Sequence, residues 1–277
     1  MRPARSTLHG TSADSKPNKP IRSYHVGRGK RHFAADRLVC WVTCGPTTNA
    51  VGGGAAVTIT TDYPFSDTVE VRVASKHPFP LHLRIPSWVD GATISVDEGP
   101  PQRASITGAF HTIDNVGGPS GSIVVLTMRN SIRVEEGGYN DSSVSIHRGP
   151  LLFAMDIGNN VTVVNSSNGG SPAGMDHFQE YQVEPTKPWN MALDADETAL
   201  EFVGTVGALG AEQPFSPDHA PVRIKARGRL LPQWGMLNYS ASPPPMSPVH
   251  STEPWQDLIL LPFGSTNIRM AQLPTLA

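Results

Sequence analysis

Apolar and polar residues alternate in short runs along most of the chain after residue 55. The clearest run is TVEVRV at 68–73, in which every second residue is a valine. This period of two is typical of a β-strand with one buried face. Similar runs occupy 56–61, 81–85, 92–96, 122–128, 131–136, 143–157, 180–184, 221–228, 257–262 and 267–273. The pattern therefore predicts a long series of short strands.

Turn-forming residues separate these runs. The chain contains 26 glycines and 26 prolines, which occur in segments such as VDGA, DEGPP and NVGGPSG. No segment has a sustained helical period with caps, and 191–202 has room for a turn or two at most. Many short strands divided by turns are typical of β-sandwiches and barrels. We therefore expect an all-β fold with little helix.

The spacing of the runs changes after Ile157. A polar segment rich in Gly, Ser and Asn follows at 158–174, and the later runs are separated by longer loops that contain proline. We interpret this segment as a bridge between two β-sandwich domains, at 43–140 and 141–277. The run at 143–157 lies at the junction and is long enough to be shared by both.

Residues 1–42 differ in composition from the rest of the chain. Residues 1–38 hold nine Lys or Arg against two Asp, a net charge of +7, whereas the whole chain carries −2, so residues 39–277 carry −9. The segment lacks the apolar core of a secretory signal and the amphipathic face of a transit peptide. A solvated charge run is more common than a basic arm that binds nucleic acid. We expect a disordered basic leader and no nucleic-acid partner.

The sequence contains little that points to a metal site. Cys40 and Cys44 are the only cysteines, and their C-x3-C spacing without a second pair is not that of a zinc finger. They are interpreted as a buried thiol pair or one local disulfide. The ten histidines are scattered, with no H-x-H or H-x-x-x-H pair. We therefore predict no metal ligand and no cofactor in this chain.

The acidic residues do not suggest a glycosidase centre. Such a centre needs two carboxylates that face each other across the scissile bond, and adjacency in sequence does not provide this geometry. No nucleophile elbow and no phosphate-binding loop is present either. We predict no catalytic residue, and we interpret the two acidic clusters as solvated turns: Glu135 with Glu136, and Asp194, Asp196 with Glu197.

Aromatic residues at strand ends and in proline-rich loops are the remaining candidates for a site. Trp88 follows the run FPLHLRIPSW at 79–88, in which Pro86 ends the strand. Such rings can stack on sugars, but an indole beside proline in a β-protein more often packs in a core. The candidates for carbohydrate or interdomain contact are Tyr63, Trp88, Trp189, Trp234 and Trp255.

Four N-glycosylation sequons lie in loop-like sequence and favour a secreted protein, although chance accounts for part of them. They begin at Asn140, Asn160, Asn165 and Asn238. No apolar run reaches the ~18 residues that span a bilayer, so no membrane partner is expected. Without a secretory signal, the localisation of this chain stays unassigned.

The order of several motifs resembles a known family. The motifs are TDYPFSDTVEVRV (61–73), FPLHLRIPSW (79–88), VSIHRGPLLFAMDIG (144–158), KPWNMALD (187–194) and LILLPFGSTNIRMAQLPTL (258–276). They resemble the C-terminal part of the β-L-arabinofuranosidase family, glycoside hydrolase family 127 (GH127), particularly its fungal members. The resemblance covers residues 43 to 277 and nothing before them.

The resemblance implies that catalysis belongs to a domain other than the β-sandwiches. In that family a helical barrel carries catalysis, with a zinc-bound Cys nucleophile from an adjacent Cys-Cys pair and a Glu acid/base, and two β-sandwiches pack against it. Cys40 and Cys44 do not match that pair, so no catalytic or zinc-binding role is carried over to them. We expect this chain to be the non-catalytic β-sandwich portion of a GH127-like glycosidase, behind an unrelated leader.

The expected partner is thus the catalytic barrel, and we expect an apolar surface for it around Tyr63–Phe65 and Trp88. The alternative is a free-standing carbohydrate-binding module that uses Trp189, Trp234 or Trp255 and binds a glycan. A cell-surface adhesion domain is a third interpretation, which has only the sandwich composition behind it. Exposed, coplanar indoles on one face would favour the binding module.

Overall fold

Most of the predicted strands are present, and the described chain is all-β. The computed structural model describes residues 38–40, 47–51, 55–104, 107–137, 143–166, 179–204, 214–238 and 240–277. Within these residues the only helical elements are two 3-10 turns, η2 (Glu197–Ala199) and η3 (Phe263–Ser265). No helix in this part of the chain is long and apolar enough to cross a membrane. The predicted leader at 1–42 lies outside the described residues except for the strand at 38–40.

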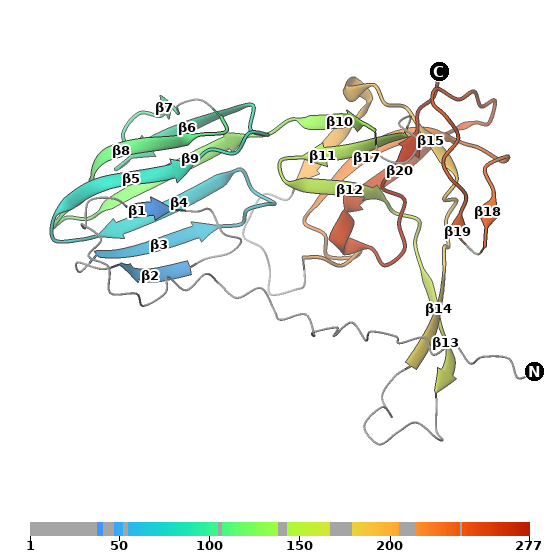
Figure 1. Ribbon diagram of the computed structural model, residues 1–277, viewed down its shortest axis with the longest axis horizontal. Coiled ribbons are helices and arrows are strands. Elements are labelled where there is room, and N and C mark those ends of the chain that lie inside the picture. The colour runs from blue at the N-terminus through green and yellow to red at the C-terminus, as the bar shows by residue number, and fades with distance from the viewer. Residues whose placement is uncertain are drawn as a thin grey trace, which may run out of the picture. The chain divides into compact units, whose positions relative to one another are not determined.

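The first sandwich consists of two sheets (Figure 1). Its larger sheet has the strand order β2-β3-β4-β9-β6-β7, and its smaller sheet has the order β1-β5-β8. These strands are β1 (Leu38–Cys40), β2 (Thr47–Val51), β3 (Ala55–Thr61), β4 (Thr68–Ala74), β5 (Pro78–Arg84), β6 (Gly91–Val96), β7 (Gln102–Arg103), β8 (Phe110–Gly117) and β9 (Ser122–Arg129). All neighbours are antiparallel except β1 and β5, which pair in parallel.

Alternate side chains of both sheets enclose one core. In β4 the valines of the TVEVRV run are buried at 1–2% exposure, which confirms the face that the alternation predicted. They pack with residues of the smaller sheet such as Leu81 and Leu83, and with Leu126 of β9. The sequence pattern did not indicate β8, because its residues FHTIDNVG include few large apolar side chains.

The second sandwich is built from one eight-stranded sheet. The main order is β10-β11-β12-β20-β17-β15, with β16 paired to β17 and β21 paired to β11. The strands are β10 (Ile132–Glu136), β11 (Ser143–Arg148), β12 (Leu151–Met155), β15 (Met191–Leu193), β16 (Glu201–Gly204), β17 (Val222–Leu230), β20 (Trp255–Pro262) and β21 (Leu273–Pro274). Its core contains Phe153, Ile224 and Leu260.

A short strand links β11 to β15, the edge strand at the far end of this sheet. Leu273 of β21 pairs with Val144 of β11, and Thr275 forms a bridge to Leu193 of β15. The sheet therefore curls around the second core. The contact with Thr275 covers part of the β15 edge, which would otherwise offer unpaired backbone groups to another chain.

Two predicted elements differ in detail. The run at 143–157 is a hairpin and not one strand, because Gly149 takes a positive φ of 55° between β11 and β12. The expected strand at 267–273 is absent from these described residues, apart from Leu273 at the start of β21.

β10 pairs with β11 along its length, from Ile132↔Arg148 to Glu136↔Val144. It therefore belongs to the second sheet although it precedes residue 140.

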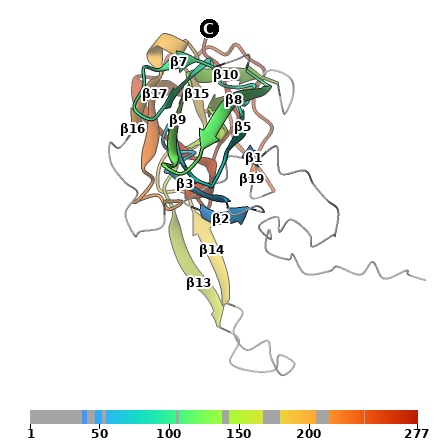
Figure 2. The same cartoon turned by 90° about the vertical axis from the view of Figure 1, so that its left-hand side faces the viewer.

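The polar segment at 158–174 is not only a bridge. Its first part forms β13 (Asn160–Ser166), which pairs with β14 (Gln179–Glu184) in a separate two-stranded hairpin. Figure 2 shows this hairpin extending beyond the sheet to which its ends connect. Another small hairpin joins β18 (Met236–Leu237) to β19 (Ser240–Ala241). Composition alone suggested a loop at 158–174, because Asn, Ser and Gly outnumber its valines.

The two sandwiches belong to one unit, Ala35–Ala277, and contact each other through the turn between β3 and β4. Asp67 in this turn accepts hydrogen bonds from both terminal nitrogens of Arg148 on β11, at 3.1 and 2.6 Å. The Asn130 side-chain amide donates to the same carboxylate at 3.0 Å. The guanidinium of Arg148 also lies 3.8 Å from the ring centroid of Phe202. This polar junction fixes the turn against the second sheet.

Candidate functional site

The acidic clusters have structural roles. Asp194 accepts a hydrogen bond from Nε of Arg227 at 2.7 Å, and Asp196 caps η2 by accepting from the Thr198 backbone N–H at 2.9 Å. Hydrogen bonds from Thr198 lower the pKa of Asp196 below its ordinary value. No group of three or more His, Cys, Asp or Glu among the described residues could hold a metal ion. Glu135 and Glu136 are adjacent in β10, so their side chains point to opposite faces of the sheet.

A serine–histidine–glutamate cluster on β10 and β11 was not recognised from the sequence. Ser145 Oγ lies 3.0 Å from Nε2 of His147, and Glu135 Oε2 lies 3.5 Å from the same nitrogen. In a catalytic triad the carboxylate holds Nδ1 while Nε2 faces the nucleophile. Here both partners contact Nε2, so the cluster cannot relay a proton in that way. The cross-strand register predicts its proximity, since Glu135 pairs with Ser145 and Arg133 with His147.

The same cluster makes stability depend on pH. Burial lowers the pKa of His147, Glu135 opposes the shift, and Arg133 adds to it. The unfolded chain therefore binds a proton at His147 more readily than the folded chain does. We expect stability to be retained above about pH 6.5, the ordinary histidine value, and to fall as the pH drops below it. Urea unfolding at pH 8 and pH 5 should show a smaller pH difference for His147→Gln than for the unsubstituted chain; an equal difference would contradict this assignment.

Two of the predicted aromatic candidates pack on the first sandwich. Tyr63 and Trp88 are partly buried against its core. Trp88 Nε1 is buried and has no hydrogen-bond partner. Within the segment Tyr63–Phe65, Phe65 packs partly buried against the second core, and its ring centroid lies 5.2 Å from that of Phe215. These side chains therefore contribute to packing within and between the sandwiches.

The other three candidates lie in the second sandwich and differ in exposure. Trp189 and Trp234 meet edge to face at 5.3 Å and 71°, and Trp234 is only 3% exposed. Its Nε1 donates to the backbone oxygen of Ser242 at 2.9 Å. Trp255 is 44% exposed, and the guanidiniums of Arg227 and Arg229 lie 4.7 and 4.4 Å from its ring centroid. Of the four described tryptophans, only Trp255 offers a large exposed ring.

The sequons and the cysteines are only partly described. Asn160 begins β13, Asn165 also lies in β13, and Asn238 has a positive φ of 51° in the turn between β18 and β19. Cys40 ends β1. Asn140 and Cys44 lie outside the described residues. Glycosylation at the four asparagines stays a prediction.

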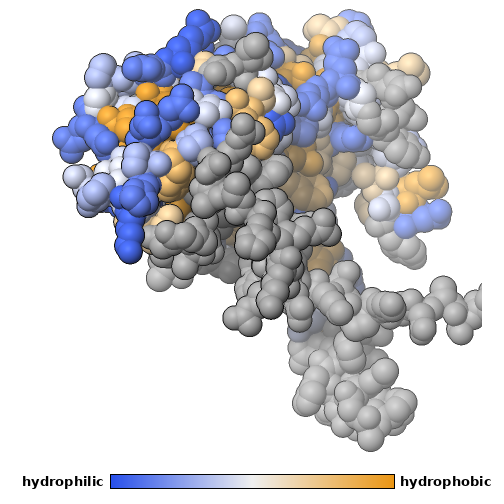
Figure 3. Space-filling view, turned by 60° about the vertical axis from the view of Figure 1, so that its left-hand side comes forward, coloured by the Kyte–Doolittle hydropathy of each residue, from blue (hydrophilic) through white to orange (hydrophobic). Residues whose placement is uncertain are grey.

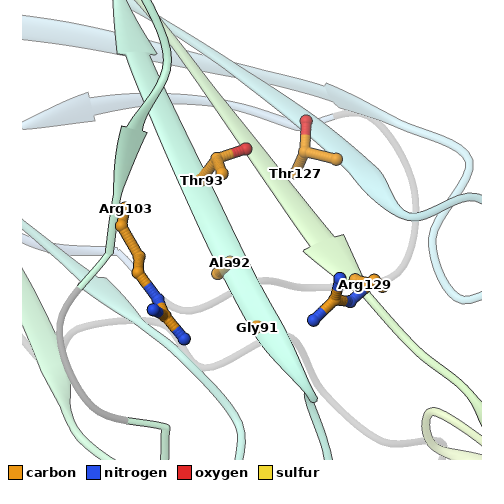
Figure 4. A pocket seen from close by; sticks show the side chains of 6 residues that line it. All are labelled: Gly91, Ala92, Thr93, Arg103, Thr127 and Arg129. Atoms are coloured by element: carbon orange, nitrogen blue, oxygen red, sulfur yellow. The ribbon is translucent and has the colours of Figure 1, made fainter.

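Hollows on the described surface include two lined by charged side chains. One has a volume of about 370 Å³ and lies over β6, β7 and β9; Figure 4 shows Arg103 and Arg129 on either side of it. The other, of about 280 Å³, includes Asp156, Asp218 and Lys187 in its lining. Asp156 and Lys187 form an ion pair, so much of the charge in the second hollow is already neutralised. In the first hollow, by contrast, Arg103 and Arg129 form no such ion pair.

Comparison with known proteins gives a family match for part of the chain. Residues 44–128 match the family model described as "Beta-L-arabinofuranosidase, GH127 middle domain". These residues contain most of the first sandwich, from β2 to β9. Comparison with curated proteins gives no match.

Three solved structures have a similar fold. A protein described as a glycoside hydrolase has a TM-score of 0.55 and 17% identity, with 88% of this chain and 37% of its own chain covered. A GH127 β-L-arabinofuranosidase from Geobacillus stearothermophilus has a TM-score of 0.52, 18% identity and coverages of 87% and 34%. Another GH127 β-arabinofuranosidase has a TM-score of 0.53, 14% identity and coverages of 87% and 35%. This chain spans about a third of their length, and most of it has a fold similar to part of these structures.

Proposed function

We propose that the two sandwiches form the non-catalytic β-portion of a GH127-like glycosidase and support a separate catalytic domain. The observation that carries this proposal is the asymmetric coverage of the similar enzymes. About seven-eighths of this chain matches them, at 87–88%, but the match accounts for only 34–37% of their length. The resemblance in sequence motifs implies that the remainder includes the helical barrel with its zinc-bound cysteine.

The chemistry of the described residues supports a non-catalytic role. Glu135 contacts Arg133 and His147, and Asp194 is paired with Arg227. These carboxylates stabilise strands and turns. Asp156 and Asp218 both line the second hollow, but Asp156 is paired with Lys187. The zinc of the resembled family would belong to the catalytic domain, and no residue is assigned to it here.

Exposed apolar residues on the β13–β14 hairpin also support a partner domain. Val161, Val163 and Tyr181 are 48%, 49% and 55% exposed, and Val163 pairs directly with Tyr181 across the strands. They therefore share one face of a ribbon that has only two strands. An isolated two-stranded hairpin is at best marginally stable in water. In contrast, the face of the first sandwich that is turned forward in Figure 3 shows mainly hydrophilic residues, with hydrophobic groups among them.

A hydrolysis assay tests the proposal. The purified chain should release no p-nitrophenol from an aryl β-L-arabinofuranoside or from other aryl glycosides, with or without added zinc. Circular dichroism in the same buffer should confirm that the chain is folded as a β-protein. Turnover that scales with chain concentration and disappears with a chelator would mean that this chain carries a working centre.

The binding-module alternative depends on Trp255. A single exposed indole, flanked by two guanidiniums, offers a smaller sugar platform than several coplanar rings would. Glycan-array binding that is lost in Trp255→Ala, with unchanged thermal stability, would favour the alternative. Binding that persists in this variant would exclude Trp255 as the platform.

A further inference from the structure

The hollow over β6, β7 and β9 lies on the outer face of the six-stranded sheet. Ala92 and Ile94 of β6 point into the first core, so Gly91 and Thr93 lie on the opposite face. Gly91 pairs with Arg129 of β9, while Thr93 pairs with Thr127 of β9 and with Arg103 of β7. The sheet register therefore brings two arginines and two threonines together around one glycine.

The two arginines approach the glycine from opposite sides. Figure 4 shows the guanidinium groups of Arg103 and Arg129 directed towards Gly91 from the two neighbouring strands. Gly91 has no side chain, and a Cβ placed there would lie 3.5 Å from Nη2 of Arg129. The glycine thus leaves the floor of the hollow open between the two positive charges.

Neither guanidinium is used by the fold. Most described arginines form an ion pair or hydrogen bond, such as Arg148 with Asp67. Within the described residues only the guanidinium groups of Arg103, Arg129 and Arg223 have neither an ion pair nor a hydrogen bond. Each guanidinium carries five N–H donors, so this hollow presents up to ten uncommitted donors, beside the hydroxyls of Thr93 and Thr127.

We propose that this hollow binds the oxyanions of an acidic polysaccharide, either carboxylates or sulfates. The planar fork of a guanidinium matches a carboxylate or sulfate with two parallel hydrogen bonds. The threonine hydroxyls can donate to and accept from sugar hydroxyls beside the anion. The inference rests on the proposed function in one respect, which is the choice of a polysaccharide as the molecule that bears the carboxylate or sulfate groups.

The charge and shape of the region argue against other anionic ligands. Two arginines without an aromatic ring in the lining are neither the broad basic surface nor the stacking platform that nucleic-acid binding requires. The hollow is also shallow, because Thr93, Arg103, Thr127 and Arg129 are all exposed. Small free anions favour enclosed sites, whereas a polymer can lie across an open sheet and use several weak contacts.

Binding of defined polymers to the purified chain tests the inference. Affinity electrophoresis should show retention by polygalacturonate or dextran sulfate, and none by neutral arabinan or galactan. Arg103→Ala and Arg129→Ala should each weaken binding about three- to tenfold, and Arg→Lys changes should weaken it less. Arg223→Ala is the matched control, because this exposed arginine is also unpaired but lies on β17 of the second sandwich. It should leave binding unchanged, and added salt should weaken binding.

Several outcomes would overturn the inference. They are no retention by either acidic polymer, equal retention by neutral arabinan, an equal loss in Arg223→Ala, or tighter binding to a single-stranded RNA than to polygalacturonate. Comparison of polygalacturonate with dextran sulfate identifies which oxyanion is preferred. Melting temperatures of the variants should match that of the unsubstituted chain. None of these results depends on hydrolysis, so failure here is distinguishable from failure of the proposed function.

Discussion

Replacing Asp67 with alanine is expected to lower the free energy of unfolding by about 2–4 kcal/mol. Asp67 joins the β3–β4 turn of the first sandwich to Arg148 of the second, through two hydrogen bonds of 3.1 and 2.6 Å. The side chains are only 28% and 12% exposed. Removal of the carboxylate would leave the guanidinium of Arg148 largely buried beside Phe202 without its counter-charge.

The matched control for this change is an exposed ion pair within one sandwich. Glu70 and Arg72 approach within 2.7 Å, but their side chains are 31% and 58% exposed. Glu70→Ala should therefore cost less than about 1 kcal/mol. Urea unfolding followed by circular dichroism and by tryptophan fluorescence measures both variants. Equal effects of the two substitutions would show that the Asp67–Arg148 pair does not hold the sandwiches together.

Replacing Gly228 with alanine is expected to destabilise the second sandwich by about 3 kcal/mol. Gly228 lies within β17 and pairs with Leu193 of β15 and Gln256 of β20. A Cβ at this position would lie 2.3 Å from the backbone oxygen of Ala192 and 2.9 Å from Cδ1 of Leu258. The backbone oxygen cannot rotate away, so β15 would have to shift.

Gly235→Ala is the control for this substitution, because a Cβ there meets nothing within 4 Å. It should change stability by less than about 0.5 kcal/mol. Thermal unfolding of both variants provides the comparison. Similar melting temperatures for Gly228→Ala and the unsubstituted chain would contradict the packing of β15 on β17.

The alternation of apolar and polar residues was sufficient to predict strands in which one face is buried and the other is exposed to solvent. β4 is the clearest case, because Val69, Val71 and Val73 enter the core between polar neighbours. The all-β fold was confirmed for this reason. β8 and β13 were not predicted, since their residues are largely polar, and pairing with a neighbouring strand stabilises each of them. Pairing partners far apart in sequence are not visible in a local pattern.

The candidate site was less predictable than the fold. The aromatic candidates could be found from composition, but their burial could not, because Trp234 and Trp255 occur in similar proline-rich sequence and are 3% and 44% exposed. Arg103 and Arg129 lie 26 positions apart and come together only through their strand pairings with β6. A site whose residues are brought together by strand pairing can be predicted only when the register of that pairing is known.

The proposed function requires that this chain carry no nucleophile for glycoside hydrolysis. Labelling with a mechanism-based electrophile in the β-L-arabinofuranose configuration, followed by intact mass spectrometry, tests it at the level of a single turnover. An intact GH127 β-L-arabinofuranosidase serves as the positive control, and the denatured chain reports non-specific reaction of Cys40 and Cys44. We expect no adduct on the folded chain beyond that background, in the presence or absence of zinc. A stoichiometric, zinc-dependent adduct on Cys40 or Cys44 would contradict it.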